Sequence, residues 1–212
     1  MRRVCRTGAA GDIDVWVVDL SAPGDPDLLD AVERERLTRL REPNRRRVAS
    51  STVAVRSILG RYLGVHGGDV VFRRHCRTCG SIEHGKPHLA GVHEAALEWS
   101  LSRSGDLALV AVSAGGPVGV DVERVRPLRD PLRAASTFLG PSDLEAIERA
   151  PRTARSREVL TRWAEREALA KARGVGVRAC ISTRIDRSVT ARWRFDEVPV
   201  SPVYVAAVVS PA

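Results

Sequence analysis

Two acidic residues alternate with valines in the segment Gly119-Val120-Asp121-Val122-Glu123. The valines predict a strand, and residues two apart in a strand project from one face, so the carboxylates of Asp121 and Glu123 should lie together. Two like charges beside a core are costly unless a cation neutralises them, and carboxylate oxygens suit a hard ion such as Mg²⁺. The segment therefore predicts a magnesium site. The alternative is an exposed strand face whose acids pair with Arg124 and Arg126.

A second pair of opposite charges, Glu167 and Lys171, lies in segment 163–172, which has helical periodicity. Residues four apart share one face of a helix, the usual geometry of a stabilising surface ion pair. Alanines at every fourth position of the same segment instead leave the backbone open to close packing against a strand or a ligand. These alanines are Ala164, Ala168 and Ala172. The spacing alone leaves both interpretations open.

Lysine is rare in this basic chain. The sequence has 34 lysine and arginine residues and a formal net charge of +8, but the only lysines are Lys86 and Lys171. An ammonium is a compact charge whose pKa can fall far enough for proton transfer, whereas a guanidinium stays protonated. Either the two lysines remain by chance, or each does something that arginine cannot do.

Two upstream segments carry groups suited to phosphate. In Gly85-Lys86-Pro87 the glycine permits close backbone approach, the proline fixes the turn and the lysine can meet a phosphate. Leu101-Ser102-Arg103-Ser104 places two hydroxyls and a guanidinium at a strand end, where they could bind phosphate oxygens. Each segment is a weak signal by itself.

Together, and in this order, the four segments resemble the Sfp-type phosphopantetheinyl transferases. That family combines a Gly-x-Asp-x-Glu strand with a later Trp-x-x-Lys-Glu-Ala-x-x-Lys helix, and it has a Gly-Lys-Pro loop and a Ser-His-Ser turn upstream. The resemblance extends from about Arg47 to Lys171, with matches at Gly85, Lys86, Pro87, Ser102, Ser104, Gly119, Asp121, Glu123, Trp163, Glu167, Ala168 and Lys171. Arg103 replaces the family's histidine and Arg166 replaces a helix lysine, so we expect altered affinity or pH dependence with activity retained.

The resemblance implies an enzyme, a holo-[acyl-carrier-protein] synthase or 4′-phosphopantetheinyl transferase. It would move 4′-phosphopantetheine from coenzyme A to a carrier serine and release adenosine 3′,5′-bisphosphate. The implied magnesium ligands are Asp121, Glu123 and Glu167, and the implied catalytic residues are Glu167 and Lys171. The implied coenzyme A contacts are Arg47, Lys86, Pro87, Ser102, Arg103, Asp121 and Lys171, with Arg45 and Arg46 as alternatives to Arg47.

In the implied mechanism, Glu167 takes the proton of the carrier serine, directly or through a metal-bound water, and Lys171 stabilises or protonates the departing bisphosphate. The expected partner is an acidic acyl- or peptidyl-carrier protein steered by the basic surface, and residues 125–139 are a candidate docking segment. Carriers of fatty acid, polyketide and nonribosomal-peptide synthesis present the same serine chemistry, so the sequence does not choose among them.

Composition favours a soluble protein, because 43% of the residues are hydrophobic but no apolar run approaches the roughly 20 residues that cross a bilayer. The N-terminus is basic without the apolar stretch of a secretion signal. We expect a cytoplasmic monomer with no membrane contact. The four cysteines, Cys5, Cys76, Cys79 and Cys180, should be reduced thiols.

A different class of function, nucleic-acid binding, would use segment 75–84 as a zinc-knuckle-like loop. Its candidate ligands are His75, Cys76, Cys79 and His84. A structural zinc site needs four ligands and the loop has one Cys-x-x-Cys pair, so a loop with two buried thiols is the alternative. Aromatic residues make up only 4% of the chain, which weakens base stacking, and we expect no nucleic-acid partner.

The predicted elements follow the order strand, helices, strands twice. Residues 13–20 are a predicted strand, 27–41 and 45–63 helices, and 70–74 a short strand before an irregular loop that ends at Gly85-Lys86-Pro87. Residues 97–102, 107–113 and 118–124 should form an antiparallel meander, with a turn at 104–106. Residues 131–138, 141–149 and 153–173 are predicted helices, and 180–185, 191–198 and 203–209 are predicted strands.

This order predicts an α+β fold of two similar subdomains related by internal pseudo-duplication, each a small, mostly antiparallel sheet packed with helices. The N-terminal half, 1–115, would contact the phosphates and adenine of coenzyme A. The C-terminal half, 116–212, would carry the metal strand and the catalytic helix. If the halves pack face to face, the interface between them is the natural site.

Overall fold

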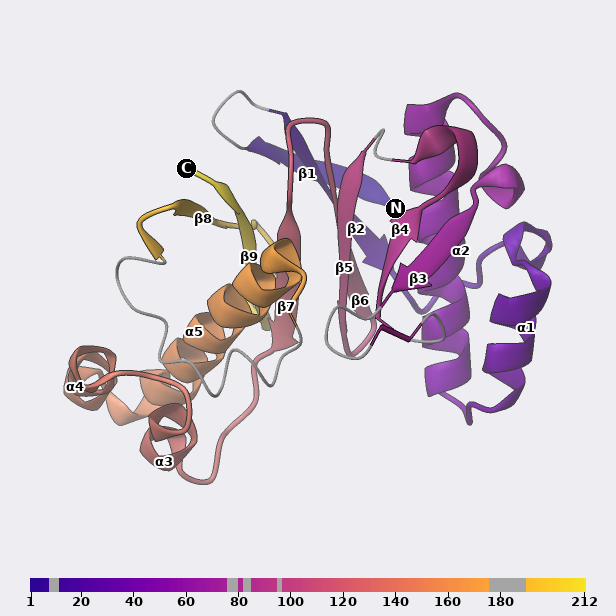
Figure 1. Ribbon diagram of the computed structural model, residues 1–212. Coiled ribbons are helices and arrows are strands. Elements are labelled where there is room, and N and C mark those ends of the chain that lie inside the picture. Colours follow the sequence, from indigo (N-terminus) through magenta and orange to yellow (C-terminus); the bar gives the residue numbers. More distant parts are fainter. Residues whose placement is uncertain (8–11, 76–79, 82–84, 95–96, 176–189) are drawn as a thin grey trace.

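Two β-sheets pack against each other at the centre of the molecule, and a long helix covers the outer face of each sheet (Figure 1). The structure is a computed structural model, and it describes every residue except 8–11, 76–79, 82–84, 95–96 and 176–189. The helix–sheet–sheet–helix arrangement buries one face of each helix and both faces of each sheet, which explains why several strands are apolar along their whole length.

The first sheet has the strand order β1-β2-β6-β5 and is antiparallel. Its strands are β1 (Arg2–Thr7), β2 (Ile13–Asp19), β5 (Glu98–Ser104) and β6 (Leu107–Ser113). Alternate residues face opposite sides. Ile13 and Val15 join the core between the sheets, whereas Val18 packs against helix α2 (Asn44–Leu63).

Helix α1 (Ala31–Thr38) and the small hairpin of β3 (Phe72–His75) and β4 (Lys86–Leu89) complete this side of the molecule. Short 3-10 turns occupy Pro26–Leu28, Gly67–Asp69 and Gly91–His93. Arg56 of α2 is only 1% exposed, and its guanidinium lies 2.7 Å from the carboxylates of both Asp30 and Glu33. These two acids cap the start of α1, so the buried arginine fastens α1 to α2.

The second sheet has the order β7-β9-β8, with β7 (Gly119–Arg124), β8 (Trp193–Glu197) and β9 (Tyr204–Pro211), and it too is antiparallel. Helix α5 (Arg152–Arg173) covers its outer face and ends at Gly174, which has the left-handed conformation that favours glycine (φ 66°). Helices α3 (Pro131–Ser136) and α4 (Pro141–Arg149) pack against α5 around Phe138.

The α+β class and most of the predicted elements are confirmed. Two details of the prediction are wrong. The strand at 118–124 does not continue a meander with β6, because β7 pairs with β9 in the other sheet. The loop before Leu89 is shorter than expected, because Lys86 and Pro87 already belong to β4. The predicted strand at 180–185 lies outside the described residues.

The two sheets share one topological feature. In the first sheet β6 lies between β2 and β5, and in the second β9 lies between β7 and β8. The second strand of the β5–β6 hairpin and the second strand of the β8–β9 hairpin are therefore both interior strands. The internal duplication and its boundary at 115/116 stay predictions. No helix in the described part of the chain is long and apolar enough to cross a bilayer.

Candidate active site

Strand β7 and helix α5 approach each other unusually closely at Gly119. A Cβ atom on this residue would lie 1.8 Å from the carbonyl oxygen of Ala168 and 2.6 Å from the amide nitrogen of Ala172. Both alanines are buried. The small residues of α5 therefore pack against a strand, one of the two uses that the sequence suggested, and bring Glu167 and Lys171 of α5 towards the acids of β7.

Asp121 is the most buried acid of this region, with 3% of its surface exposed. Its Oδ1 accepts hydrogen bonds from the Lys171 ammonium and from the Ser102 hydroxyl, each at 2.6 Å. Lys171 also donates to the backbone carbonyl of Val120 at 3.2 Å. The second carboxylate oxygen, Oδ2, is buried and has no hydrogen-bond partner among the described residues, which is costly unless something else reaches it.

Three carboxylates and one ammonium line a cavity of about 390 Å³ between β5, β7 and α5. The charged lining residues are Arg103, Asp121, Glu123, Glu167 and Lys171. Burial raises the pKa of Glu167, and the charges of Asp121 and Glu123 raise it further, against the opposing effect of Lys171. Burial first, and then the neighbouring carboxylate of Asp121, also raises the pKa of Glu123. The cavity therefore favours an added cation.

Lys171 and Glu123 pair with different partners. Lys171 directs its ammonium across to β7, so the interaction reaches a second element and is not confined to the surface of α5. Glu123 lies 3.9 Å from Arg126 and accepts a hydrogen bond from Ser104 at 3.2 Å. Pairing with arginine thus accounts for part of the Glu123 environment, whereas the buried Asp121 is paired with lysine.

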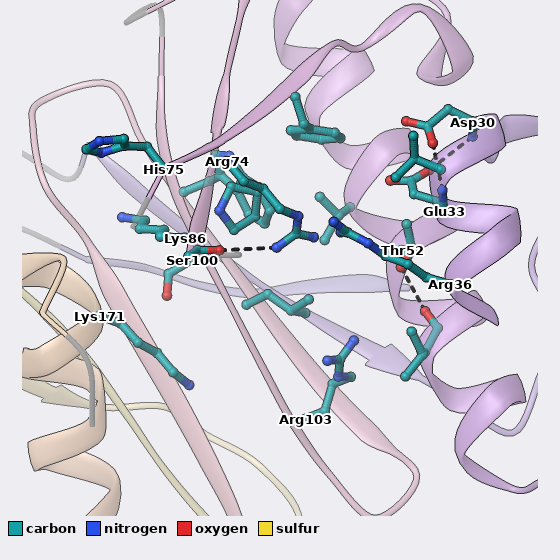
Figure 2. A pocket seen from close by; sticks show the side chains of 18 of the residues that line it. Asp30, Glu33, Arg36, Thr52, Arg74, His75, Lys86, Ser100, Arg103 and Lys171 are labelled. Carbon is teal, nitrogen blue, oxygen red and sulfur yellow. Dashed lines mark hydrogen bonds between the residues drawn. The ribbon is translucent and has the colours of Figure 1, made fainter. Parts of the chain in front are cut away.

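A larger cavity of about 680 Å³ adjoins this one, and the two share Leu101, Arg103 and Lys171 in their linings. Figure 2 shows basic side chains from several elements around it, and these labelled residues are Arg36, Arg74, Lys86, Arg103 and Lys171. Phe72, Trp99 and Leu37 supply apolar walls. The combination of cations and apolar surface suits an anionic ligand with an aromatic or aliphatic part.

Comparison with known proteins agrees with this arrangement. The sequence model of the 4′-phosphopantetheinyl transferase superfamily matches residues 117–203. The 4′-phosphopantetheinyl transferase HetI of Nostoc sp. (strain PCC 7120) is 32% identical over 173 residues, which cover 78% of this chain and 70% of that protein. The chain belongs to this superfamily.

The slr0495 protein of Synechocystis sp. (strain PCC 6803), named provisionally for the same activity, is 26% identical over 174 residues, or 82% of this chain and 68% of that protein. The family resemblance of the sequence is thus confirmed, and the chain is a 4′-phosphopantetheinyl transferase.

Among the residues of the transferase that the structure describes, no group of three His, Cys, Asp or Glu side chains is arranged ready to hold a metal ion. The chemistry of the smaller cavity nevertheless fits Mg²⁺, because its three carboxylates are hard oxygen donors and Asp121 Oδ2 is buried without a partner. The assignment of Asp121, Glu123 and Glu167 as magnesium ligands stays a prediction.

The transferase accommodates Arg103, where the family has histidine, by anchoring it to α2. Its Nη1 donates a hydrogen bond to the hydroxyl of Ser51 at 2.8 Å, and Ser51, fully buried, donates in turn to the carbonyl of Val48. The guanidinium therefore lies against α2, and Arg103 lines both cavities. Arg166, the other departure, lies with its guanidinium 5.7 Å from the ring centre of Phe138 and so helps to pack α5.

Of the other residues predicted to contact coenzyme A, some line the larger cavity of the transferase and one lies outside both cavities. Lys86 and Pro87 line the larger cavity, and Lys86 pairs with Glu98 at 3.1 Å. Arg47 lines neither cavity, and its Nε binds Asp106 in the β5–β6 turn at 2.8 Å. Its contact with coenzyme A stays a prediction.

Arg36 and Arg74, which the sequence did not single out, also line the larger cavity. Burial lowers the pKa of Arg74, and the positive charge of Arg36 lowers it further, with Glu33 and Asp30 opposing them, so an anion bound beside Arg74 would be stabilised. Nothing in their local sequence separates them from the many solvated arginines. Of the predicted zinc loop, His75 lines the larger cavity, while Cys76, Cys79 and His84 lie outside the described residues.

Proposed function

We propose that this transferase moves the 4′-phosphopantetheine arm of coenzyme A to a serine of an apo acyl- or peptidyl-carrier protein and requires Mg²⁺. The supporting observation is the junction of two adjoining cavities at Arg103 and Lys171, one rich in cations and the other lined by three carboxylates. Coenzyme A carries a pyrophosphate, a 3′-phosphate and an adenine, which match the charges and the apolar walls.

The larger cavity would hold the nucleotide end of coenzyme A. Lys86, Arg103 and Arg74 would bind phosphate oxygens, with Arg36 as a further cation on the same wall. The pyrophosphate would then lie near Lys171, where the cavities meet. Ion pairs with Glu98 and Asp121 hold the two lysine ammoniums in place before the substrate arrives.

Asp121, Glu123 and Glu167 would hold Mg²⁺, which when bound neutralises charge on the pyrophosphate. In the transfer itself, an Oγ–P bond to the carrier serine forms while the bond from phosphorus to the bridging pyrophosphate oxygen breaks, and adenosine 3′,5′-bisphosphate leaves. Glu167, whose carboxylate lines the same cavity, would take the serine proton. Lys171 would stabilise the charge on the departing phosphate.

The decisive experiment incubates the protein with an apo-carrier, coenzyme A and Mg²⁺ and follows the carrier by mass spectrometry. We expect the carrier to gain one phosphopantetheine and the gain to stop when a chelator removes the metal. Transfer that continues at full rate with excess chelator would exclude the magnesium requirement. A carrier that stays unmodified across fatty acid, polyketide and nonribosomal-peptide types would contradict the proposed acceptor.

Asp121→Ala and Glu167→Gln should reduce transfer by about 100-fold or more while the far-ultraviolet circular dichroism is unchanged. Glu165→Gln is the matched control on the same helix, because its carboxylate pairs with Arg162 at 3.0 Å and does not line the carboxylate cavity. Normal turnover in either of the first two variants would remove the assigned roles.

The carrier is expected to be acidic, and segment 125–139, which contains α3, remains the candidate docking surface. A monomeric, cytoplasmic enzyme without a nucleic-acid partner also remains our expectation. For the alternative zinc-loop function, zinc analysis of the purified protein is the direct test.

A further inference from the structure

Three serines on β5 face β7 across the junction of the two sheets. Ser100, Ser102 and Ser104 occupy alternate positions, so their side chains share one face of β5. Their hydroxyls accept hydrogen bonds from successive outward-facing amides of β7. The donors are Val120 at 3.1 Å, Val122 at 3.3 Å and Arg124 at 2.9 Å. We call these three residues the serine ladder.

The serine ladder takes the place of backbone pairing. Strand β5 pairs with β6 on its other edge and β7 pairs with β9, so β5 and β7 are facing edges of different sheets. The partners advance in step along both strands, which therefore run parallel. Because a side chain stands between the two backbones, the strands lie farther apart than paired strands would. The carboxylate cavity opens beside this gap, with Ser102 and Val122 in its lining.

Two of the three hydroxyls also hold the acids of the site. Ser102 donates to Asp121 at 2.6 Å, and Ser104 donates to Glu123 at 3.2 Å. A hydroxyl has one hydrogen to donate. Since a phosphate oxygen of coenzyme A needs a donor, Ser102 could bind it only by releasing Asp121.

We propose that Ser102 and Ser104 are positioning residues, which fix the β7 carboxylates from the neighbouring sheet. The serine ladder then joins the two sheets and sets the orientation of Asp121 and Glu123 through the same hydroxyls. The expected effect on transfer rests on the proposed function, because it needs Asp121 and Glu123 to take part in the reaction. The connection of the two sheets by the serine ladder does not depend on that function.

The test compares Ser102→Ala with wild type by two measurements. Amide hydrogen exchange, followed by NMR, should become faster at Val122, because its hydrogen-bond acceptor is lost. In steady-state assays kcat should fall by about 10- to 100-fold with the KM for coenzyme A within about twofold of wild type. Ser102→Thr keeps a hydroxyl on a strand-compatible side chain, and it should restore most of kcat and the protection of Val122.

Ser104→Ala repeats the test at the more exposed end of the ladder, with exchange read at Arg124, in case Ser102→Ala does not fold. Ser210→Ala is the matched control, since this buried serine of β9 lines neither cavity and its hydroxyl bonds to the carbonyl of Pro211. A raised KM for coenzyme A with normal kcat and normal exchange at Val122 would show a phosphate contact and overturn the proposal. A wild-type protein that transfers nothing would contradict the proposed function. Amide exchange at Val122 would still show whether the serine ladder connects the two sheets.

Discussion

At the scale of single residues, the environment of Glu167 links the chemistry of the site to the stability of the fold. Burial and the neighbouring charges of Asp121 and Glu123 raise its pKa in the folded protein, with Lys171 opposing them. The folded state therefore holds the proton of Glu167 more tightly than the unfolded chain, whose glutamate pKa is about 4.3. As pH rises from there through the raised folded value, this group contributes a loss of stability.

Glu167→Gln should consequently raise the free energy of unfolding at pH 7.5 in the absence of metal and coenzyme A, even though it removes transfer activity. The advantage should shrink towards zero below about pH 4, where wild-type Glu167 is protonated in both states. Urea denaturation of both proteins at the two pH values measures the difference. A variant that is less stable than wild type at pH 7.5 would show that the carboxylate is held favourably, contrary to the inferred direction.

At the scale of elements, the contact of β7 with α5 depends on the absence of a side chain at Gly119. Gly119→Ala would place a methyl group within 1.8 Å of the Ala168 carbonyl, so the helix must move and shift Glu167 and Lys171 relative to Asp121. We expect a loss of about 1–3 kcal/mol in stability, together with reduced transfer.

Thermal denaturation and the transfer assay check the Gly119 prediction. Gly140→Ala is the appropriate control, because a Cβ at that position meets nothing within 4 Å and its φ of −80° suits alanine. Equal stability of the two variants would mean that the close approach is relieved without moving α5.

Helix α1 depends similarly on the buried guanidinium of Arg56. Arg56→Ala leaves the largely buried Glu33 carboxylate without its cation and removes the donor to three backbone carbonyls. It should cost about 3–5 kcal/mol, because a buried charge is then left unpaired. Arg39→Ala removes an exposed pair with Glu35 and should change stability by less than about 1 kcal/mol. Urea denaturation distinguishes the two cases, and similar losses in both would contradict the structural role of Arg56.

Some elements could be predicted from the sequence and others could not. Local patterns are sufficient for β2, α2 and α5, because a strand or helix with a buried face carries its own periodicity. The pairing of β7 was mispredicted because its partner β9 follows some 80 residues later in the chain and leaves no local mark. The hydrogen bonds that join Ser102 and Ser104 to β7 could not be predicted, because the amides that donate them belong to another sheet. Arg36 and Arg74 became visible only when folding brought α1 and β3 to one cavity.

At the scale of the whole molecule, the larger cavity has walls from both halves of the chain, with α1, α2, β3 and β4 on one side and Lys171, Gly174 and Val175 on the other. Coenzyme A bound there would contact α1 and α2, which lie beside the first sheet, and the end of α5, which covers the second. Ligand binding should therefore stabilise the entire fold, by about 2.7 kcal/mol when the ligand is present at 100 times its Kd.

The net charge of +8 gives a further prediction at this scale. Long-range attraction of an acidic carrier is screened over about 8 Å at physiological ionic strength, so kcat/KM for the carrier should fall steadily as sodium chloride is added. The KM for coenzyme A, which binds in a cavity at short range, should change less. Stopped-flow or steady-state assays from low to high salt test this, and a salt-independent kcat/KM for the carrier would argue against electrostatic steering.

The scarcity of lysine has a practical result. The chain's two ε-amino groups, on Lys86 and Lys171, both border the larger cavity, and their side chains are 20% and 26% exposed. A reagent that acylates amines can thus mark only these two positions and the N-terminus. Peptide mapping after mild acylation, with and without coenzyme A, would report occupancy of the cavity directly, with no need for a carrier or for turnover.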